Sequence, residues 1–203
     1  LPVLRARHAR KNAKVNIADI KQSVNNMELI PNPLILHRSV EPELVANLYE
    51  INTRELDETT DERFGNGKTT DWNLFDDNLF IMGKVVEDLI SIIKKAFNSD
   101  IFIADSFFNI LSAGSGSSPH AHLNALDKNI GLNLASQKHV FQYYLRVGDQ
   151  SCSEPGIYKL YEPNEEILPS EGMVIIIPAG RRHSAVYDGK TDRVMIGINF
   201  YTL

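Results

Sequence analysis

Residues 173 to 201, MVIIIPAGRRHSAVYDGKTDRVMIGINFY, contain two apolar runs separated by a polar, turn-rich segment. The runs, Met173 to Pro178 and Val194 to Tyr201, are rich in the β-branched and aromatic residues that strands favour. His183 and Arg193 lie between them, ten residues apart. The stretch therefore predicts two strands late in the chain, with a histidine and an arginine close to their ends.

Three upstream runs have the same character: Ile101 to Leu111, Val140 to Val147 and Ile157 to Tyr161. Two helices are predicted before them. One begins near Pro42, because proline suits the first helical position. The other spans about Asp76 to Phe97, where apolar residues recur at helical spacing. Helices followed by short strands predict a mainly β domain with flanking helices (α+β), in which the helices support a β-sandwich or barrel.

Length and composition narrow the class of protein. The chain has 203 residues, 43% of them hydrophobic and 23% charged, which is typical of a globular domain with one sizeable core. No apolar run is long enough to cross a bilayer, so we expect no membrane partner. The single cysteine, Cys152, cannot form an internal disulfide, which favours a reducing compartment and predicts a cytoplasmic protein. The net charge of −5 makes nucleic acid an unlikely main partner.

The first residues differ from the rest of the chain. Residues 1–27 show no clear alternation and predict an N-terminal arm or the end of a preceding module, ahead of a domain over residues 28–203. The arm is basic and is either a solvated face or a binding segment for RNA or another acidic partner. We favour the solvated face, because no aromatic residue lies between the charges to stack on bases. The basic residues are Arg5, Arg7, Arg10, Lys11 and Lys14.

Three histidines form a candidate metal site. His120 and His122 follow a serine- and glycine-rich stretch, and alternate residues of an extended segment project to one face. His183 would join them from a distant strand. A non-haem iron oxygenase needs three ligands on one face and open positions for dioxygen and a co-substrate. Arg193, on an adjacent strand, could hold a carboxylate through its forked guanidinium. A lone His-x-His is weak evidence, but the joint pattern favours a metal site over chance.

Several stretches resemble, in the same order, the Fe(II)/2-oxoglutarate-dependent dioxygenases, and specifically their prolyl-hydroxylase-like branch. The resemblance covers about residues 30 to 203. It implies a double-stranded β-helix, also called a jelly roll and similar to the cupins, with helices packed outside the major sheet. The matching stretches are Tyr143-Tyr144-Leu145, Gly156 to Leu160, Glu171 to Pro178, Arg181 to Val186 and Asp192 to Phe200.

The resemblance also implies a site and an activity. Iron(II) would be bound by His120, His122 and His183, and the C5 carboxylate of the co-substrate 2-oxoglutarate by Arg193 and Tyr144. The implied enzyme is a hydroxylase that oxidises an unactivated carbon of a small-molecule or peptidyl substrate and releases succinate and CO2. No catalytic residue beyond the metal centre is predicted. Other polar residues could line the pocket or face outward: Asn109, Gln142 and Asn199.

His122 departs from the family pattern, which has aspartate or glutamate as the second ligand. A neutral imidazole leaves the ferrous ion its full double charge. Three outcomes stay open: a working three-histidine centre, which we favour, a carboxylate supplied from elsewhere, or altered or lost chemistry. Asp127 is the nearest substitute carboxylate, although an ordinary role within a loop or flap over residues 123–133 is the stronger expectation.

Two alternative functions also stay open. A cupin-like metal dioxygenase that does not use 2-oxoglutarate would suit three histidines, but it would have no need of Arg193. A catalytically silent jelly-roll binding module is the other, since fold alone does not guarantee activity. Substrate choice would depend on loops over residues 57–73 and 123–139. The sequence predicts neither the substrate nor the oligomeric state.

Overall fold

The computed structural model describes residues 32–55, 68–69, 73–150 and 156–203. The chain divides into two compact units, Leu1–Ile30 and Pro31–Leu203, and all described residues belong to the second. The predicted arm over residues 1–27 and Cys152 lie outside the described residues, as does most of the predicted loop over residues 57–73.

Two long helices and one short helix lie where the apolar periodicity predicts helical structure. Helix α2 spans Pro42–Glu55, α3 spans Leu74–Asp77 and α4 spans Leu79–Phe97. The predicted helix from Asp76 is thus two helices, because the backbone at Asn78 leaves the helical conformation with φ −125°. A short 3₁₀ helix follows later, at Ile130–Leu132. None of the described helices is long and apolar enough to cross a membrane.

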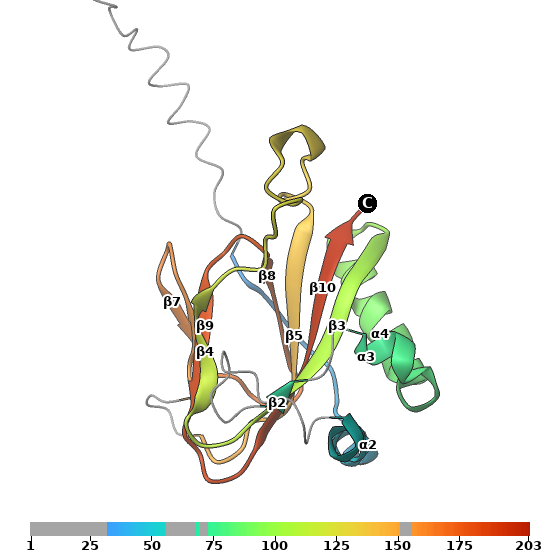
Figure 1. The fold of residues 1–203 in the computed structure, drawn as a ribbon, viewed down its shortest axis with the longest axis vertical. Coiled ribbons are helices and arrows are strands. Elements are labelled where there is room, and N and C mark those ends of the chain that lie inside the picture. Colours follow the sequence, from blue (N-terminus) through green and yellow to red (C-terminus); the bar gives the residue numbers. More distant parts are fainter. Residues whose placement is uncertain (1–31, 56–67, 70–72, 151–155) are drawn as a thin grey trace, which may run out of the picture. The chain divides into compact units, whose positions relative to one another are not determined.

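The strands form two antiparallel sheets that face each other (Figure 1). The six-stranded major sheet has the order β1-β8-β5-β10-β3-β2, and the four-stranded minor sheet has the order β4-β9-β6-β7. The strands of the major sheet are β1 Leu34–His37, β2 Lys68–Thr69, β3 Ile101–Leu111, β5 Lys138–Arg146, β8 Met173–Pro178 and β10 Arg193–Thr202. Those of the minor sheet are β4 Ser115–His120, β6 Tyr158–Leu160, β7 Glu165–Ile167 and β9 His183–Tyr187.

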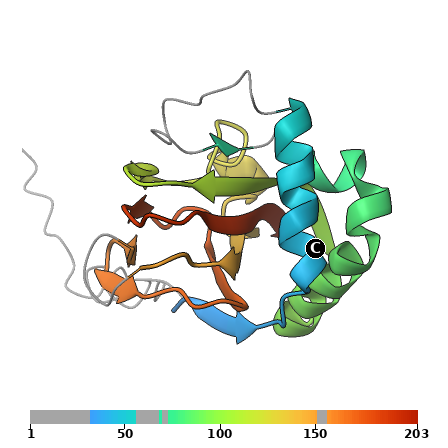
Figure 2. The ribbon, with the colours of Figure 1, turned by 90° about the horizontal axis from the view of Figure 1, so that it is seen from below.

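The helices cover the outer face of the major sheet, and the minor sheet covers its inner face (Figures 1 and 2). One core cluster joins α2, α3 and α4 to the outward-facing side chains of the sheet; it includes Leu48 of α2, Leu89 of α4 and Phe108 of β3. A second cluster, which includes Tyr144, Tyr158 and Met195, lies between the two sheets. This arrangement confirms the predicted jelly roll with helices outside the major sheet.

Strand β10 shows how one segment serves both clusters. Val194, Ile196, Ile198 and Phe200 belong to the cluster beneath the helices, whereas Met195 belongs to the cluster between the sheets. Successive side chains of a strand point to opposite faces, so Arg193, Met195, Gly197 and Asn199 face the interior. A Cβ at Gly197 would come within 2.3 Å of the Phe107 ring, so only glycine leaves room for that ring. The interior face of β10 thereby forms part of the wall of the site.

Candidate metal centre

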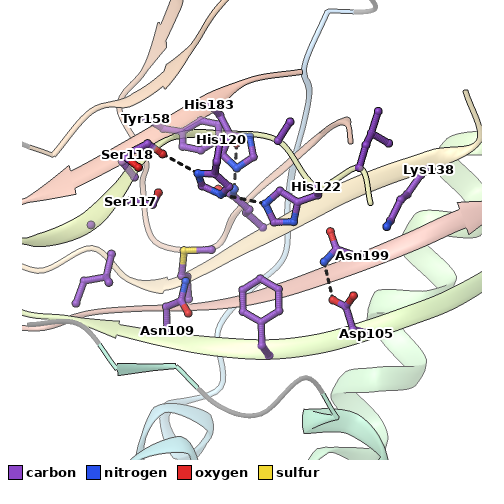
Figure 3. A pocket seen from close by; sticks show the side chains of 18 of the residues that line it. Asp105, Asn109, Ser117, Ser118, His120, His122, Lys138, Tyr158, His183 and Asn199 are labelled. Carbon is purple, nitrogen blue, oxygen red and sulfur yellow. Dashed lines mark hydrogen bonds between the residues drawn. The ribbon is translucent and has the colours of Figure 1, made fainter. Parts of the chain in front are cut away.

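The three predicted histidines converge at one end of the minor sheet (Figure 3). His120 ends β4, and His183 begins β9 directly opposite it in the register of these two strands. His122 lies two residues past β4, where its backbone N–H donates to the carbonyl of Ala179 at 2.8 Å. One ring nitrogen from each histidine lies within 4.8 Å of the others. The Nε2 atoms of His120 and His122 are 3.2 Å apart. This set could hold one metal ion.

Main-chain carbonyls orient two of the three rings. Nδ1 of His120 lies 2.8 Å from the carbonyl oxygen of Ser118, and Nδ1 of His183 lies 3.2 Å from that of Arg181. A carbonyl can only accept, so each Nδ1 must carry the proton. The lone pair of each ring is then on Nε2, and a second contact of this kind is how proteins orient histidine ligands.

Burial keeps two of the imidazoles neutral. It lowers the pKa of His183 to about 3, with the neighbouring His122 and His120 acting in the same direction. Burial also lowers the pKa of His122 to about 4, again helped by His120. Because a metal binds the neutral imidazole, both rings are in the binding form at neutral pH without first losing a proton.

The histidines line a cavity of about 510 Å³, a size usual for small-molecule sites. Asn109, Gln142 and Asn199, which the sequence left as either lining or outward-facing residues, all line it. Further polar residues do so as well and were not predicted, among them Asp105, Lys138 and Tyr158. Periodicity gives no signal for Asp105 or Lys138, because apolar residues occupy both faces of β3 and β5. Tyr158 lies within the glycine-initiated run, and its ring centroid is 5.4 Å from that of His183.

Arg193 lies on the interior face but not in the cavity wall. Its side chain is fully buried, 4.6 Å from the ring centroid of Tyr187 and 5.9 Å from that of Tyr144. Its Nη2 donates to the carbonyl of Gly156 at 2.9 Å and to the side chain of Gln150. Nε and Nη1 are buried without a hydrogen-bond partner among the described residues. A buried cation with two free donors suits an anionic ligand.

Tyr144 is likewise interior and outside the cavity wall. Its hydroxyl donates to the Gln142 side chain at 3.1 Å, and Gln142 in turn donates to the hydroxyl of Tyr158 at 3.0 Å. Burial raises the pKa of Tyr144, so its hydroxyl keeps its proton. The structure therefore brings the three histidines together and places Arg193 and Tyr144 side by side behind the cavity.

Asp127 does not join the histidine cluster. Its carboxylate is buried in an ion pair with Lys138, 2.7 Å between Nζ and Oδ2, and accepts hydrogen bonds from the backbone N–H of Asn124 and the hydroxyl of Tyr201. Within the described residues, no carboxylate belongs to the candidate metal group. These contacts of Asp127 anchor the segment between β4 and β5. They agree with the expectation that Asp127 is an ordinary loop residue.

No protein-family model matches the sequence, and no curated protein matches it. Several solved structures match the structure of this chain. One is a prolyl hydroxylase from Trichoplax adhaerens in complex with a peptide fragment of the hypoxia inducible factor oxygen degradation domain, with TM-score 0.59, 15% identity, and 93% of this chain and 94% of that chain covered. Another is the viral collagen prolyl hydroxylase of Paramecium Bursaria Chlorella virus-1 in its 2-oxoglutarate complex, with TM-score 0.63, 9% identity, and 85% and 97% covered.

A third similar structure is HygX from Streptomyces hygroscopicus with nickel and 2-oxoglutarate bound, with TM-score 0.61, 12% identity, and 90% of this chain and 87% of that chain covered. At these identities the likeness concerns the fold. It confirms, at that level, the resemblance that the motifs indicate. The chain has the jelly-roll fold of the 2-oxoglutarate- and iron(II)-dependent oxygenases, with a cluster of three histidines inside it.

Proposed function

We propose that this chain is an Fe(II)- and 2-oxoglutarate-dependent oxygenase that hydroxylates an unactivated carbon and releases succinate and CO2. The observation that carries the proposal is the convergence of His120, His122 and His183 on one wall of a cavity inside this fold. Three imidazoles are a donor set that iron(II) accepts, and they leave other positions free.

The residues behind the cavity suit the co-substrate. The guanidinium of Arg193 has two unpartnered donors and is buried, so the C5 carboxylate of 2-oxoglutarate would provide the missing counter-charge. The Tyr144 hydroxyl, held by Gln142, is the second candidate contact. Neither residue lines the cavity, whereas Met195, one interior position along β10 from Arg193, does.

These placements assign different roles to the bound cofactors and to the side chains of the protein. Iron(II) and 2-oxoglutarate, when bound, supply the oxidising power with dioxygen. The chain would bind iron(II) through His120, His122 and His183 and orient these rings through second contacts. The apolar wall formed by Phe107, Leu111 and Met195 would exclude water. A cavity of this size accepts a small molecule or one side chain of a peptide, which are the two proposed substrate classes.

The decisive experiment is an anaerobically loaded turnover assay. Purified chain with Fe(II) and 2-oxoglutarate is expected to release succinate, slowly without substrate and faster with a peptide or metabolite that gains one oxygen atom by mass. His183→Ala should abolish release, and His37→Ala, which removes an exposed histidine far from the cluster, should not. No 2-oxoglutarate binding and no succinate would sink the proposal. Oxygen uptake without 2-oxoglutarate would instead support a cupin-like dioxygenase, and metal binding without any turnover would support a silent binding module.

A further inference from the structure

One ring of the histidine cluster lacks the second contact that the other two have. Nδ1 of His120 and Nδ1 of His183 each meet a main-chain carbonyl. For His122, no main-chain carbonyl among the described residues contacts the ring; its Nε2 lies 3.2 Å from that of His120, and the side chain of Asn199 is its other polar neighbour. His122 is also the ligand position at which the similar family has a carboxylate. Its Nδ1–H, once Nε2 binds a metal, needs an acceptor.

Asn199 is placed to be that acceptor. It is buried on the interior face of β10 and lines the cavity with His122. Its Nδ2 donates to Oδ1 of Asp105 at 2.6 Å, whereas its Oδ1 is buried without a hydrogen-bond partner among the described residues. Figure 3 shows the amide between the two residues, with its nitrogen toward Asp105 and its oxygen on the side of His122.

The direction of the amide follows from chemistry. A carboxylate only accepts hydrogen bonds, so the NH2 group of Asn199 must face Asp105 and the oxygen must face away from it. Asp105 is the only carboxylate among the described residues that line the cavity. The nearby cation, Lys138, is already paired with Asp127 at 2.7 Å, so it does not form the ion pair that would neutralise Asp105.

We propose that Asn199 is a positioning residue of the metal centre: it accepts the Nδ1–H of His122 and couples that ring to Asp105. The hydrogen bonds of the amide then couple the negative charge of Asp105 to the ring of His122. This charge partly compensates for the missing ligand carboxylate, which would have offset one positive charge of the ion. This extends the histidine–carboxylate pairing of metal sites by one amide. The inference rests on the proposed function only for the identity of the metal centre.

The first test measures metal affinity without co-substrate. Co(II) is titrated into wild type, Asn199→Ala and Asp105→Asn, with a chromogenic chelator as competitor. Both variants should bind Co(II) about 10–100-fold more weakly, the usual loss when an outer contact of a ligand histidine is removed. Two matched controls should bind as wild type does: Asn109→Ala removes another cavity amide, and Asp100→Asn removes an exposed carboxylate just before the same strand.

The second test detects the proposed hydrogen bond itself. In Co(II)-loaded protein the three ligand Nδ1–H protons should give three strongly shifted, exchangeable proton NMR signals. Asn199→Ala should make one of them exchange with water too fast to be seen and leave the other two, whereas Asn109→Ala should keep all three. A general structural defect would not remove one signal selectively. Asp105→Asn, which keeps the amide in place, covers the case in which Asn199→Ala does not fold.

Unchanged Co(II) affinity in both variants, with all three signals retained, overturns the inference. It is equally overturned if Asp105→Asn raises the KM of a substrate while Co(II) affinity stays as in wild type, because Asp105 would then contact substrate. These measurements need no 2-oxoglutarate, so a wild type that binds Co(II) as expected but never turns over refutes the proposed function alone. A wild type that binds no Co(II) refutes both.

Discussion

Arg193 is the residue that we propose binds the carboxylate of the co-substrate. It is a fully buried cation, and burial lowers the pKa of its guanidinium, with Tyr144 and Tyr187 acting in the opposite direction. No described carboxylate forms an ion pair with it, and two of its donors are unpartnered. A buried charge in this state is costly unless a ligand completes its coordination. An anionic ligand would supply the missing partner for these donors.

Removing that charge should weaken the binding of 2-oxoglutarate. A hydrogen bond to a charged group contributes about 1.5–3 kcal/mol, which corresponds to roughly 10–100-fold in affinity. Arg193→Ala should therefore raise the KM for 2-oxoglutarate by that factor, and Arg193→Lys, which keeps the charge but loses the fork, by less. Succinate release at varied 2-oxoglutarate concentration measures both. Arg182→Ala, the exposed arginine beside the distal histidine, should leave the KM unchanged. An unaltered KM in Arg193→Ala would assign the carboxylate contact elsewhere.

The spacing of the histidines predicted which of them meet, but not which residues surround them. His120 and His122 share a face because of the alternation of an extended segment, and their convergence with His183 is confirmed. Their role as metal ligands stays a prediction, as do the roles of Arg193 and Tyr144. Asp105 lies in the run IFIADSFFNIL, whose apolar residues occupy both faces, so no periodicity indicates which face is interior.

Among the elements, the major sheet was predictable and the minor sheet largely was not. The strand Met173–Pro178 matches its predicted bounds, and the predicted Val194 to Tyr201 differs from β10 by one residue at each end. Strand β4, SGSSPH, was missed because small polar residues favour turns locally; its pairing with β9 makes it a strand. Lys68–Thr69 was expected in a loop but forms β2 against β3, also through tertiary pairing.

Helix α4 should be a main source of stability for the major sheet. Leu89 is fully buried in the cluster that joins this helix to the strands. Leu89→Ala should lower the free energy of unfolding by about 2–5 kcal/mol, through lost transfer energy and the cavity left behind. Urea denaturation measures the change. Glu87→Ala, on the exposed face of the same helix, should stay within about 0.5 kcal/mol of wild type. Equal effects at the two positions would contradict this packing.

The segment between β4 and β5 depends on one buried ion pair. Asp127→Asn leaves the Lys138 ammonium buried and unpaired, so it should destabilise the protein by about 3–5 kcal/mol at pH 7. The double variant Asp127→Asn with Lys138→Met should lose less, because neither charge remains. Urea unfolding of wild type and both variants measures these differences. A double variant less stable than Asp127→Asn would contradict the prediction.

The same pair predicts a pH dependence. Burial alone would raise the pKa of Asp127, but the hydrogen bonds from Lys138, Tyr201 and Asn124 outweigh burial and lower it. A carboxyl whose pKa is lowered on folding stabilises the protein above its ordinary pKa of about 4, and this contribution is lost as the pH falls towards the folded value. The stability difference between wild type and Asp127→Asn should therefore shrink below about pH 4, as urea unfolding at pH 7 and pH 3.5 would detect. A constant difference would contradict the assignment.

For the whole molecule, metal binding should appear as thermal stability. A ligand that binds only the folded state at 100 times its Kd stabilises it by about 2.7 kcal/mol, and 1 kcal/mol raises the Tm of a chain of this length by about 2–4 °C. Chelator-treated protein should thus gain roughly 5–10 °C on addition of Co(II) or Mn(II). His37→Ala should gain as much, and His183→Ala very little. A full gain in His183→Ala would mean that the ion binds elsewhere.

Strand β10 also constrains how this protein can change its length over evolution. Alternate residues of this strand pack against the helices and face the cavity. A one-residue insertion or deletion within the strand would therefore turn the helix-facing side chains toward the cavity and the cavity-facing side chains toward the helices. Arg193 would turn toward the helices, and an isoleucine would enter the site. Substitutions can be accepted position by position, but length changes would be tolerated only in pairs or in the turns outside the strand. We expect homologous genes to keep the spacing from Arg193 to Asn199 constant even where little else of the sequence is shared.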